Sequence, residues 1–164
     1  MIRPIRIEGD IAYVPLTQGY EAVIDAADVP LVAGLSWYTY RHKRAIYAVT
    51  NSTDGDGRRF TLRMHSAITG FAFTDHRDGN GLNNRRSNLR PADRQQNNRN
   101  ARLRVDNACG LKGAYWHKGV RKFAAHIRSS GRPVHLGYFD TAEAAHAAYC
   151  EASALIHGEF GRTA

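Results

Sequence analysis

Short runs of β-branched and aromatic residues, separated by turn residues, dominate the first third of the chain. Such runs are typical of β-strands, and they cover residues 11–16, 21–25, 35–40, 45–50 and 59–64. The sequence T-D-G-D-G at 53–57 predicts a hairpin turn, because Asp-Gly supplies the positive φ that such turns need. We therefore expect residues 1–63 to form a β-rich extension.

The pattern changes twice further along the chain. Residues 65–104 are polar and rich in Arg and Asn, too hydrophilic to form a large core of their own. Beyond residue 110 the pattern predicts three strands, at 112–117, 122–128 and 133–139, followed by a helix over 141–157. The stretch between these parts is short, polar and ends in Gly, which indicates a linker.

The final helix has a clear start, stripe and end. Thr141 is a suitable N-cap, and Gly158 is a suitable stop. Apolar residues recur at helical spacing and predict one buried stripe, formed by Ala145, Ala148, Tyr149, Ala152, Leu155 and Ile156. A single stripe covers only one face of the three-stranded sheet. We expect the other sheet face to be exposed, with aromatic and basic side chains on it.

Charge narrows the choice of partner. The chain has 164 residues, a formal net charge of +8 and a pI near 9.9, which favours a polyanion such as nucleic acid. No apolar run approaches the roughly 20 residues that span a bilayer, and the N-terminus lacks the apolar core of a signal peptide. These features predict an intracellular protein with no membrane partner. Two cysteines, Cys109 and Cys150, indicate ordinary thiols.

The polar segment combines an Asp-His pair with many Asn and Arg residues. His76 is a candidate general base, because an imidazole can take a proton from water near neutral pH. In a strand the neighbouring Asp75 points to the opposite side, where it can face a metal ion. A general base, oxygen ligands and positive charge are what metal-assisted phosphodiester cleavage requires, so the segment predicts a nuclease.

The ordered residues Asp75-His76, Asn88 and Asn97 resemble the D-H…N…N motif of HNH homing endonucleases, and the similarity extends from Met64-His65 to Asn100. It implies a ββα-metal fold, with Pro91 opening a helix that runs to about residue 102. The resemblance makes His76 and Asn88 catalytic residues, with Asn88 bracing the loop. Asp75 and Asn97 are the implied ligands of Mg²⁺, with Mn²⁺ a usable substitute. The implied phosphate contacts are Arg77, Arg85, Arg86 and Arg94.

The C-terminal stretch, with G-L-K-G-A-Y-W-H-K-G and L-G-Y-F-D-T-A-E-A-A, resembles an Apetala-type (ethylene-response-factor) DNA-binding domain. Such a domain reads the major groove of double-stranded DNA with a three-stranded sheet. The DNA-binding residues that the resemblance implies are Lys112, Trp116, Lys118, Lys122, Arg128, Arg132 and His135. The resemblance also implies a protein that works as a monomer.

Together these features predict an α+β protein with three parts. Residues 1–104 form the HNH endonuclease domain (extension 1–63, ββα-metal core 64–104), 105–109 a linker, and 110–164 the Apetala-type domain, a three-stranded antiparallel sheet packed on one helix. The predicted function is a site-specific, homing-type or phage-borne nicking enzyme in the cytoplasm of a bacterial or phage-infected cell. The alternatives are a non-catalytic DNA-binding regulator on the same scaffold, or an RNA-binding or structural component of a mobile element. His65 is assigned a structural or substrate-side role, because Ser66 follows it where the resemblance implies Arg.

Overall fold

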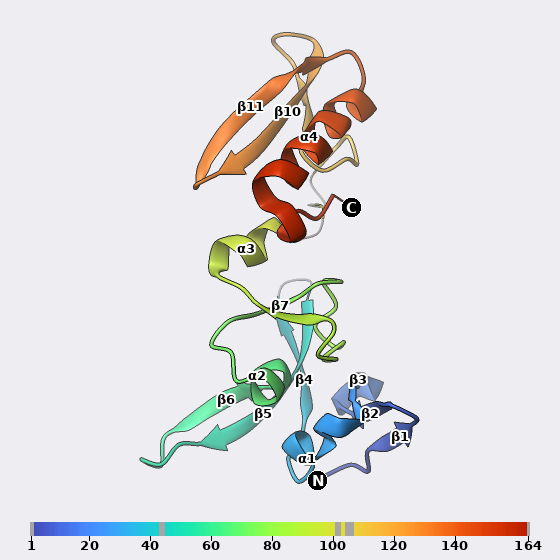
Figure 1. Cartoon of the computed structure of the whole chain (residues 1–164), viewed down its shortest axis with the longest axis vertical. Helices are drawn as coiled ribbons and strands as arrows, with labels where there is room; N and C mark the ends of the chain where they lie inside the picture. The colour runs from blue at the N-terminus through green and yellow to red at the C-terminus, as the bar shows by residue number, and fades with distance from the viewer. Residues whose placement is uncertain (1, 43–44, 101–102, 104–106, 164) are drawn as a thin grey trace. The chain divides into compact units, whose positions relative to one another are not determined.

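The computed structural model describes residues 2–42, 45–100, 103 and 107–163. The chain divides into two compact units, Met1–Asp93 and Arg94–Ala164 (Figure 1). Both are built from small antiparallel sheets, and the described residues include four α-helices. The predicted α+β class is confirmed. No helix in the described part of the chain is long and apolar enough to cross a membrane.

The first unit contains two three-stranded antiparallel sheets. One consists of β1 (Arg6–Glu8), β2 (Ile11–Pro15) and β3 (Glu21–Asp25), in that order. The other consists of β4 (Tyr38–His42), β5 (Ala45–Thr53) and β6 (Arg59–Arg63). The 3₁₀ turn η1 (Thr17–Gly19) connects β2 to β3, and the connection between the two sheets holds the 3₁₀ turn η2 (Ala26–Asp28) and the helix α1 (Val29–Val32). The predicted hairpin turn is present between β5 and β6, where Gly57 has a φ of 78°.

Helix α2 (Met64–Thr69) follows β6 directly and leads to a hairpin of β7 (Thr74–His76) and β8 (Leu89–Pro91). A twelve-residue loop, 77–88, connects the two hairpin strands. This loop also contacts β3, because Val23 donates to the carbonyl of Leu82 (2.8 Å) and accepts from the amide of Asn84 (2.7 Å). The hairpin is thereby attached to the N-terminal sheet through backbone hydrogen bonds.

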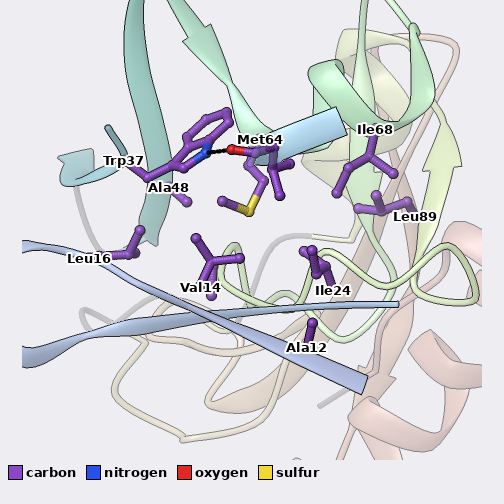
Figure 2. Packing of buried hydrophobic residues seen from close by; sticks show 11 residues of the cluster. Ala12, Val14, Leu16, Ile24, Trp37, Ala48, Met64, Ile68 and Leu89 are labelled. Carbon is purple, nitrogen blue, oxygen red and sulfur yellow. Dashed lines mark hydrogen bonds between the residues drawn. The ribbon is translucent and has the colours of Figure 1, made fainter. Parts of the chain in front are cut away.

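One hydrophobic core joins these parts of the first unit (Figure 2). Its buried side chains come from both larger sheets, from α1 and α2, and from β8. Trp37 lies at its edge, fully buried, and its indole Nε1 donates to the carbonyl of Val32 at 2.9 Å. A buried indole needs a partner for its N–H, and that bond holds Trp37 in the connection before β4 rather than in the predicted strand 35–40. The β-rich extension is therefore part of the same core as α2 and β8.

The second unit begins with α3 (Arg94–Arg99) and contains a sheet of three strands and a long helix. The sheet order is β11 (Arg132–Phe139), β10 (Lys122–Ser129) and β9 (Ala114–His117), and α4 (Ala142–His157) packs on it (Figure 1). The 3₁₀ turn η3 (Gly158–Phe160) follows the helix. Thr141 caps α4 as predicted, its hydroxyl accepting from the amide of Ala144 at 3.1 Å.

The apolar stripe of α4 differs from the prediction near its end. Leu155 and Ile156 are exposed, Leu155 at 87%. The buried positions are Ala145, Tyr149, Ser153 and His157, each four residues after the one before. His157 takes the inward position because its Nε2 bonds to the carbonyl of Arg128 at 2.7 Å, which ties the end of the helix to β10.

The prediction for Pro91 is wrong. Pro91 ends β8 opposite Thr74 instead of opening a helix, and α3 starts three residues later, at Arg94. A proline lacks the amide hydrogen, so it is tolerated on an edge strand. The predicted helix end near residue 102 lies outside the described residues, as do residues 105 and 106 of the predicted linker. Residues 107–110 form a turn in which the Asn107 side chain accepts from the amides of Cys109 and Gly110.

Candidate functional site

The β7–β8 hairpin carries the predicted Asp-His pair. Asp75 lies opposite Arg90 in the strand register, and Oδ2 of Asp75 accepts from Nε (2.8 Å) and Nη2 (2.7 Å) of Arg90. Both side chains are only 4% exposed. Removal of two charges from water is costly unless they are paired, so this ion pair fixes both groups strongly in place. Arg90 was not among the predicted site residues.

His76 is buried and has a defined orientation. Its Nε2 lies 3.3 Å from Oδ1 of Asn84. The Asn84 amide nitrogen donates to the carbonyls of Leu82 (3.2 Å) and Gly81 (3.5 Å), so the Asn84 oxygen faces the histidine. The neutral imidazole therefore carries its proton on Nε2 and its lone pair on Nδ1.

Burial lowers the pKa of His76, and the hydrogen bond to the Asn84 side-chain oxygen and the carboxylates of Asp78 and Asp75 only partly oppose this effect. A histidine with a lowered pKa is neutral at physiological pH. The neutral ring has the protonation state that a general base needs.

Asp78 and Asn88 organise the loop between the hairpin strands. Oδ1 of Asp78 accepts from the amide of Asn80 (2.7 Å) and from the Asn88 side chain (3.0 Å), and its Oδ2 accepts from the Asn83 side chain (2.8 Å). The Asn88 side chain also accepts from the amide of Asp78 (3.0 Å) and donates to the carbonyl of Asn83 (2.7 Å). Asn88 thus has the contacts of a residue that braces the loop.

The Asp78 carboxyl is the centre of these contacts, which the sequence prediction missed. Burial raises its pKa, but the hydrogen bonds from Asn80, Asn83 and Asn88 outweigh burial, and the net pKa is lowered. The sequence signal was the D-G-N triplet, since an Asp side chain that accepts from the amide two residues later is a common turn.

Two aromatic rings from other elements lie beside His76. The ring centroid of His65, on α2, is 5.0 Å from that of His76, and the centroid of Tyr47, on β5, is 6.0 Å from both. The loop lies close to β5, since a Cβ at Gly81 would be 2.4 Å from the carbonyl oxygen of Ile46 and 2.6 Å from Cδ1 of Tyr47. Only glycine fits at that position without a shift.

The predicted phosphate contacts differ in their surroundings. Arg85 donates to Asp25 (2.7 Å) and Asp10 (2.9 Å), and Arg86 donates to both carboxylate oxygens of Asp28. These two arginines hold the loop to the N-terminal sheet, and acidic partners already compensate their charge. Arg77 is exposed beside the hairpin.

The second predicted metal ligand belongs to the other unit. Asn97 is exposed on α3, as is Arg94. The pairing of Asn97 with Asp75 therefore stays a prediction. Within the described residues, no group of three or more His, Cys, Asp and Glu side chains is arranged to hold a metal ion.

The sheet face of the second unit that points away from α4 carries tyrosines and histidines. Tyr115 packs edge-on against His126 (5.2 Å between centroids), and Tyr138 lies against His117 (5.4 Å) and His135 (4.6 Å). We call this surface the Tyr-His face; it consists of Tyr115, His117, Lys122, His126, Arg128, His135 and Tyr138.

The residues predicted to bind DNA are spread over three environments. Lys122, Arg128 and His135 are exposed on the Tyr-His face, and Lys122 pairs with Asp140 at 2.9 Å. Lys118 and Arg132, two further predicted DNA-binding residues, are exposed but lie outside this face. Trp116 is exposed but packs on Phe123, on the side of the sheet toward α4.

Lys112 differs from the other predicted DNA-binding residues of the second unit, which are exposed. It is half-buried, and its ammonium donates to the carbonyl of Arg99 at 3.0 Å. Burial and the charge of Arg162 lower the pKa of Lys112 to about 8. These contacts hold the end of α3 in the second unit and leave Lys112 less suited to a phosphate contact than the exposed lysines.

A comparison of the chain with protein-family models, curated proteins and solved structures finds no match in any of the three. The chemistry of the two sites is therefore argued from their residues.

Proposed function

We propose that the protein is a metal-dependent DNA endonuclease of the HNH type, in which the first unit cuts and the second unit binds double-stranded DNA. One observation carries the proposal: His76 is neutral, is oriented through Asn84, and adjoins the buried carboxylate of Asp75. Phosphodiester hydrolysis requires a general base and a carboxylate that can bind a metal ion, and here both lie next to each other on β7, before a loop rich in Asn.

In this mechanism His76 and the residues of the loop after β7 have separate roles. The His76 imidazole accepts a proton from the attacking water, while Asn84 orients the ring through its contact with Nε2. Asn88 and Asp78 keep the loop, and with it Asn84, in a fixed position. Because the base is aligned before DNA arrives, part of the entropic barrier is already overcome.

Asp75 is the proposed metal ligand in the first unit. A carboxylate oxygen is a hard donor, so the donor chemistry fits Mg²⁺ or Mn²⁺. When bound, such an ion stabilises negative charge on the phosphate and on the departing 3′ oxygen. A single site per chain gives a nick as the expected product.

The Tyr-His face supports the DNA-binding part of the proposal. It presents exposed Arg128 and Lys122 beside aromatic rings on a three-stranded sheet, and the whole chain is strongly basic. Cationic side chains contact phosphates, and a narrow β-sheet can enter a major groove. The proposed homing-type or phage-borne role rests on the resemblance of the first part to HNH enzymes and of the last to Apetala-type domains, an order of domains that is typical of mobile, often phage-borne endonucleases.

One observation favours a second function, a DNA-binding regulator that does not cut. The carboxylate of Asp75 already has Arg90 as a buried partner, so its charge is compensated without a cation. A protein that had lost its metal would be stabilised by such a pair.

The test is cleavage of supercoiled plasmid by the full chain. We expect nicked product with Mg²⁺ or Mn²⁺ and no product in excess EDTA. Binding of duplex DNA without product, at high protein concentration and with either metal, would favour the regulator instead. Failure to bind duplex DNA would overturn both functions.

DNA binding is also expected to depend on pH. His126 lies on the Tyr-His face beside Tyr115, and it gains a positive charge as the pH falls. Burial, Arg128 and His135 lower the pKa of His126, so this charge appears only below the usual range of histidine. Each histidinium that contacts a phosphate should steepen the salt dependence of log K by about 0.9.

Fluorescence anisotropy with a short labelled duplex in EDTA measures this effect. The variant His126→Gln should lose much of the tightening at low pH. His42→Gln is the matched control, since His42 is an exposed histidine on β4 of the first unit. Equal pH dependence in His126→Gln and the native chain would contradict the prediction.

A further inference from the structure

His65 is a buried histidine that the proposed reaction does not use. It lies in the first turn of α2, is 5% exposed, and follows Met64, which is fully buried in the core. A buried imidazole is costly to place compared with an apolar side chain of similar size. Packing alone would be served equally well by leucine or phenylalanine.

The geometry of His65 relative to His76 is specific. The two rings meet edge to face, with centroids 5.0 Å apart and planes at 79°. Edge-to-face contacts restrict the orientation of both rings, because the positive edge of one ring faces the negative face of the other. Of the aromatic rings beside His76, His65 is nearer than Tyr47, at 6.0 Å.

The charge state of His65 suits this contact. Burial, with His76 and Arg63 nearby, lowers the pKa of His65 to about 3. His65 is therefore neutral wherever the protein is folded and active, and it does not compete with His76 for a proton. Its remaining contribution is the position and shape of its ring.

We infer that His65 is a positioning residue for His76: its ring fixes the plane of the His76 imidazole in which Nε2 reaches Oδ1 of Asn84. His76 is then enclosed by α2 through His65, by β5 through Tyr47 and by the loop through Asn84. Without the His65 ring, the imidazole can rotate away from Asn84 and exchange tautomers. This inference rests on the proposed function, in which His76 is the base.

Two substitutions of His65 in the full chain test whether the shape of its ring or its ring nitrogens matter. His65→Phe keeps a ring of similar size, whereas His65→Ala removes it. We expect the alanine variant to lose roughly 10- to 100-fold in kcat with little change in KM, since small misplacements of a reacting group have effects of this size. The phenylalanine variant should stay within a few-fold of the native chain. If His65→Ala does not fold, His65→Leu replaces it.

The orientation of His76 can also be measured without any cleavage assay. Ring-nitrogen chemical shifts by NMR, assigned to His76 with His76→Ala, report the tautomer at neutral pH. We expect the Nε2–H form in the native chain and in His65→Phe, and a mixture of tautomers in His65→Ala. Ile68→Ala is the matched control, because it weakens the same helix in the core and should leave the tautomer unchanged.

Different results overturn different claims. An unchanged tautomer and kcat in His65→Ala would overturn the positioning role. Loss of activity in His65→Phe equal to that in His65→Ala would assign the role to the ring nitrogens instead. A native chain that binds DNA but never cuts would overturn the nuclease, while the tautomer measurement would still decide whether His65 orients His76.

Discussion

Replacement of His76 by alanine is expected to lower the rate of DNA cleavage by roughly 10²- to 10⁴-fold, the usual contribution of a positioned general base. The structural reason is that burial lowers the pKa of His76 and Asn84 orients its ring, so the side chain has the protonation state and the fixed position that a general base needs. The measurement is the single-turnover rate of plasmid nicking with saturating Mg²⁺. Duplex binding should remain, because the Tyr-His face lies in the second unit.

A matched control is His42→Ala. His42 stacks on Tyr40 at the exposed end of β4, with ring centroids 6.5 Å apart, and no role is assigned to it. Its removal should change the rate by less than about twofold, as is usual for surface substitutions. Native rates in His76→Ala would show that another group takes the proton, and would remove the observation on which the proposed mechanism depends.

Replacement of Arg90 by methionine is expected to destabilise the first unit by about 3–5 kcal/mol. The change leaves the Asp75 carboxylate buried without the guanidinium that donates to it twice. Urea unfolding followed by the fluorescence of Trp37, in a Trp116→Phe background, reports on the first unit alone, because the chain has two tryptophans.

Two further variants test whether the unpaired Asp75 carboxylate causes the loss of stability. The double variant Asp75→Leu/Arg90→Met should recover much of the lost stability, because apolar residues of similar volume can replace a buried ion pair at little cost. Arg59→Met, at an exposed arginine on β6, should change stability by less than about 0.5 kcal/mol. A loss below about 1 kcal/mol in Arg90→Met, the usual size for an exposed ion pair, would indicate that water reaches Asp75.

The second unit could be predicted well because its signals are local. The alternation of residues gave β9, β10 and β11, and the cap at Thr141 gave the start of α4. The end of the helix could not be predicted in the same way. Its inward face there depends on the bond from His157 to the carbonyl of Arg128, a residue 29 positions away.

The sequence predicted several of the hairpin and loop residues that form the candidate site, but it did not predict which side chains contact them. Asp75, His76 and Asn88 stand out as a motif, and the Asn88 side chain does brace the loop. The partners of the first two do not stand out, because Arg90 faces Asp75 only once the strand register is known. His65 reaches His76 only because α2 packs beside the hairpin in the folded unit.

The attachment of the loop to the N-terminal sheet has a consequence for how residues 64–93 can be inherited. Asp10, Asp25 and Asp28 hold Arg85 and Arg86, and Val23 holds the loop backbone on both sides of Asn83. Residues 64–93 moved alone into another protein would bring two arginines without their acids and a loop without its supporting strand. Recombination that preserves the structure of this loop therefore has to carry residues 1–28 together with it.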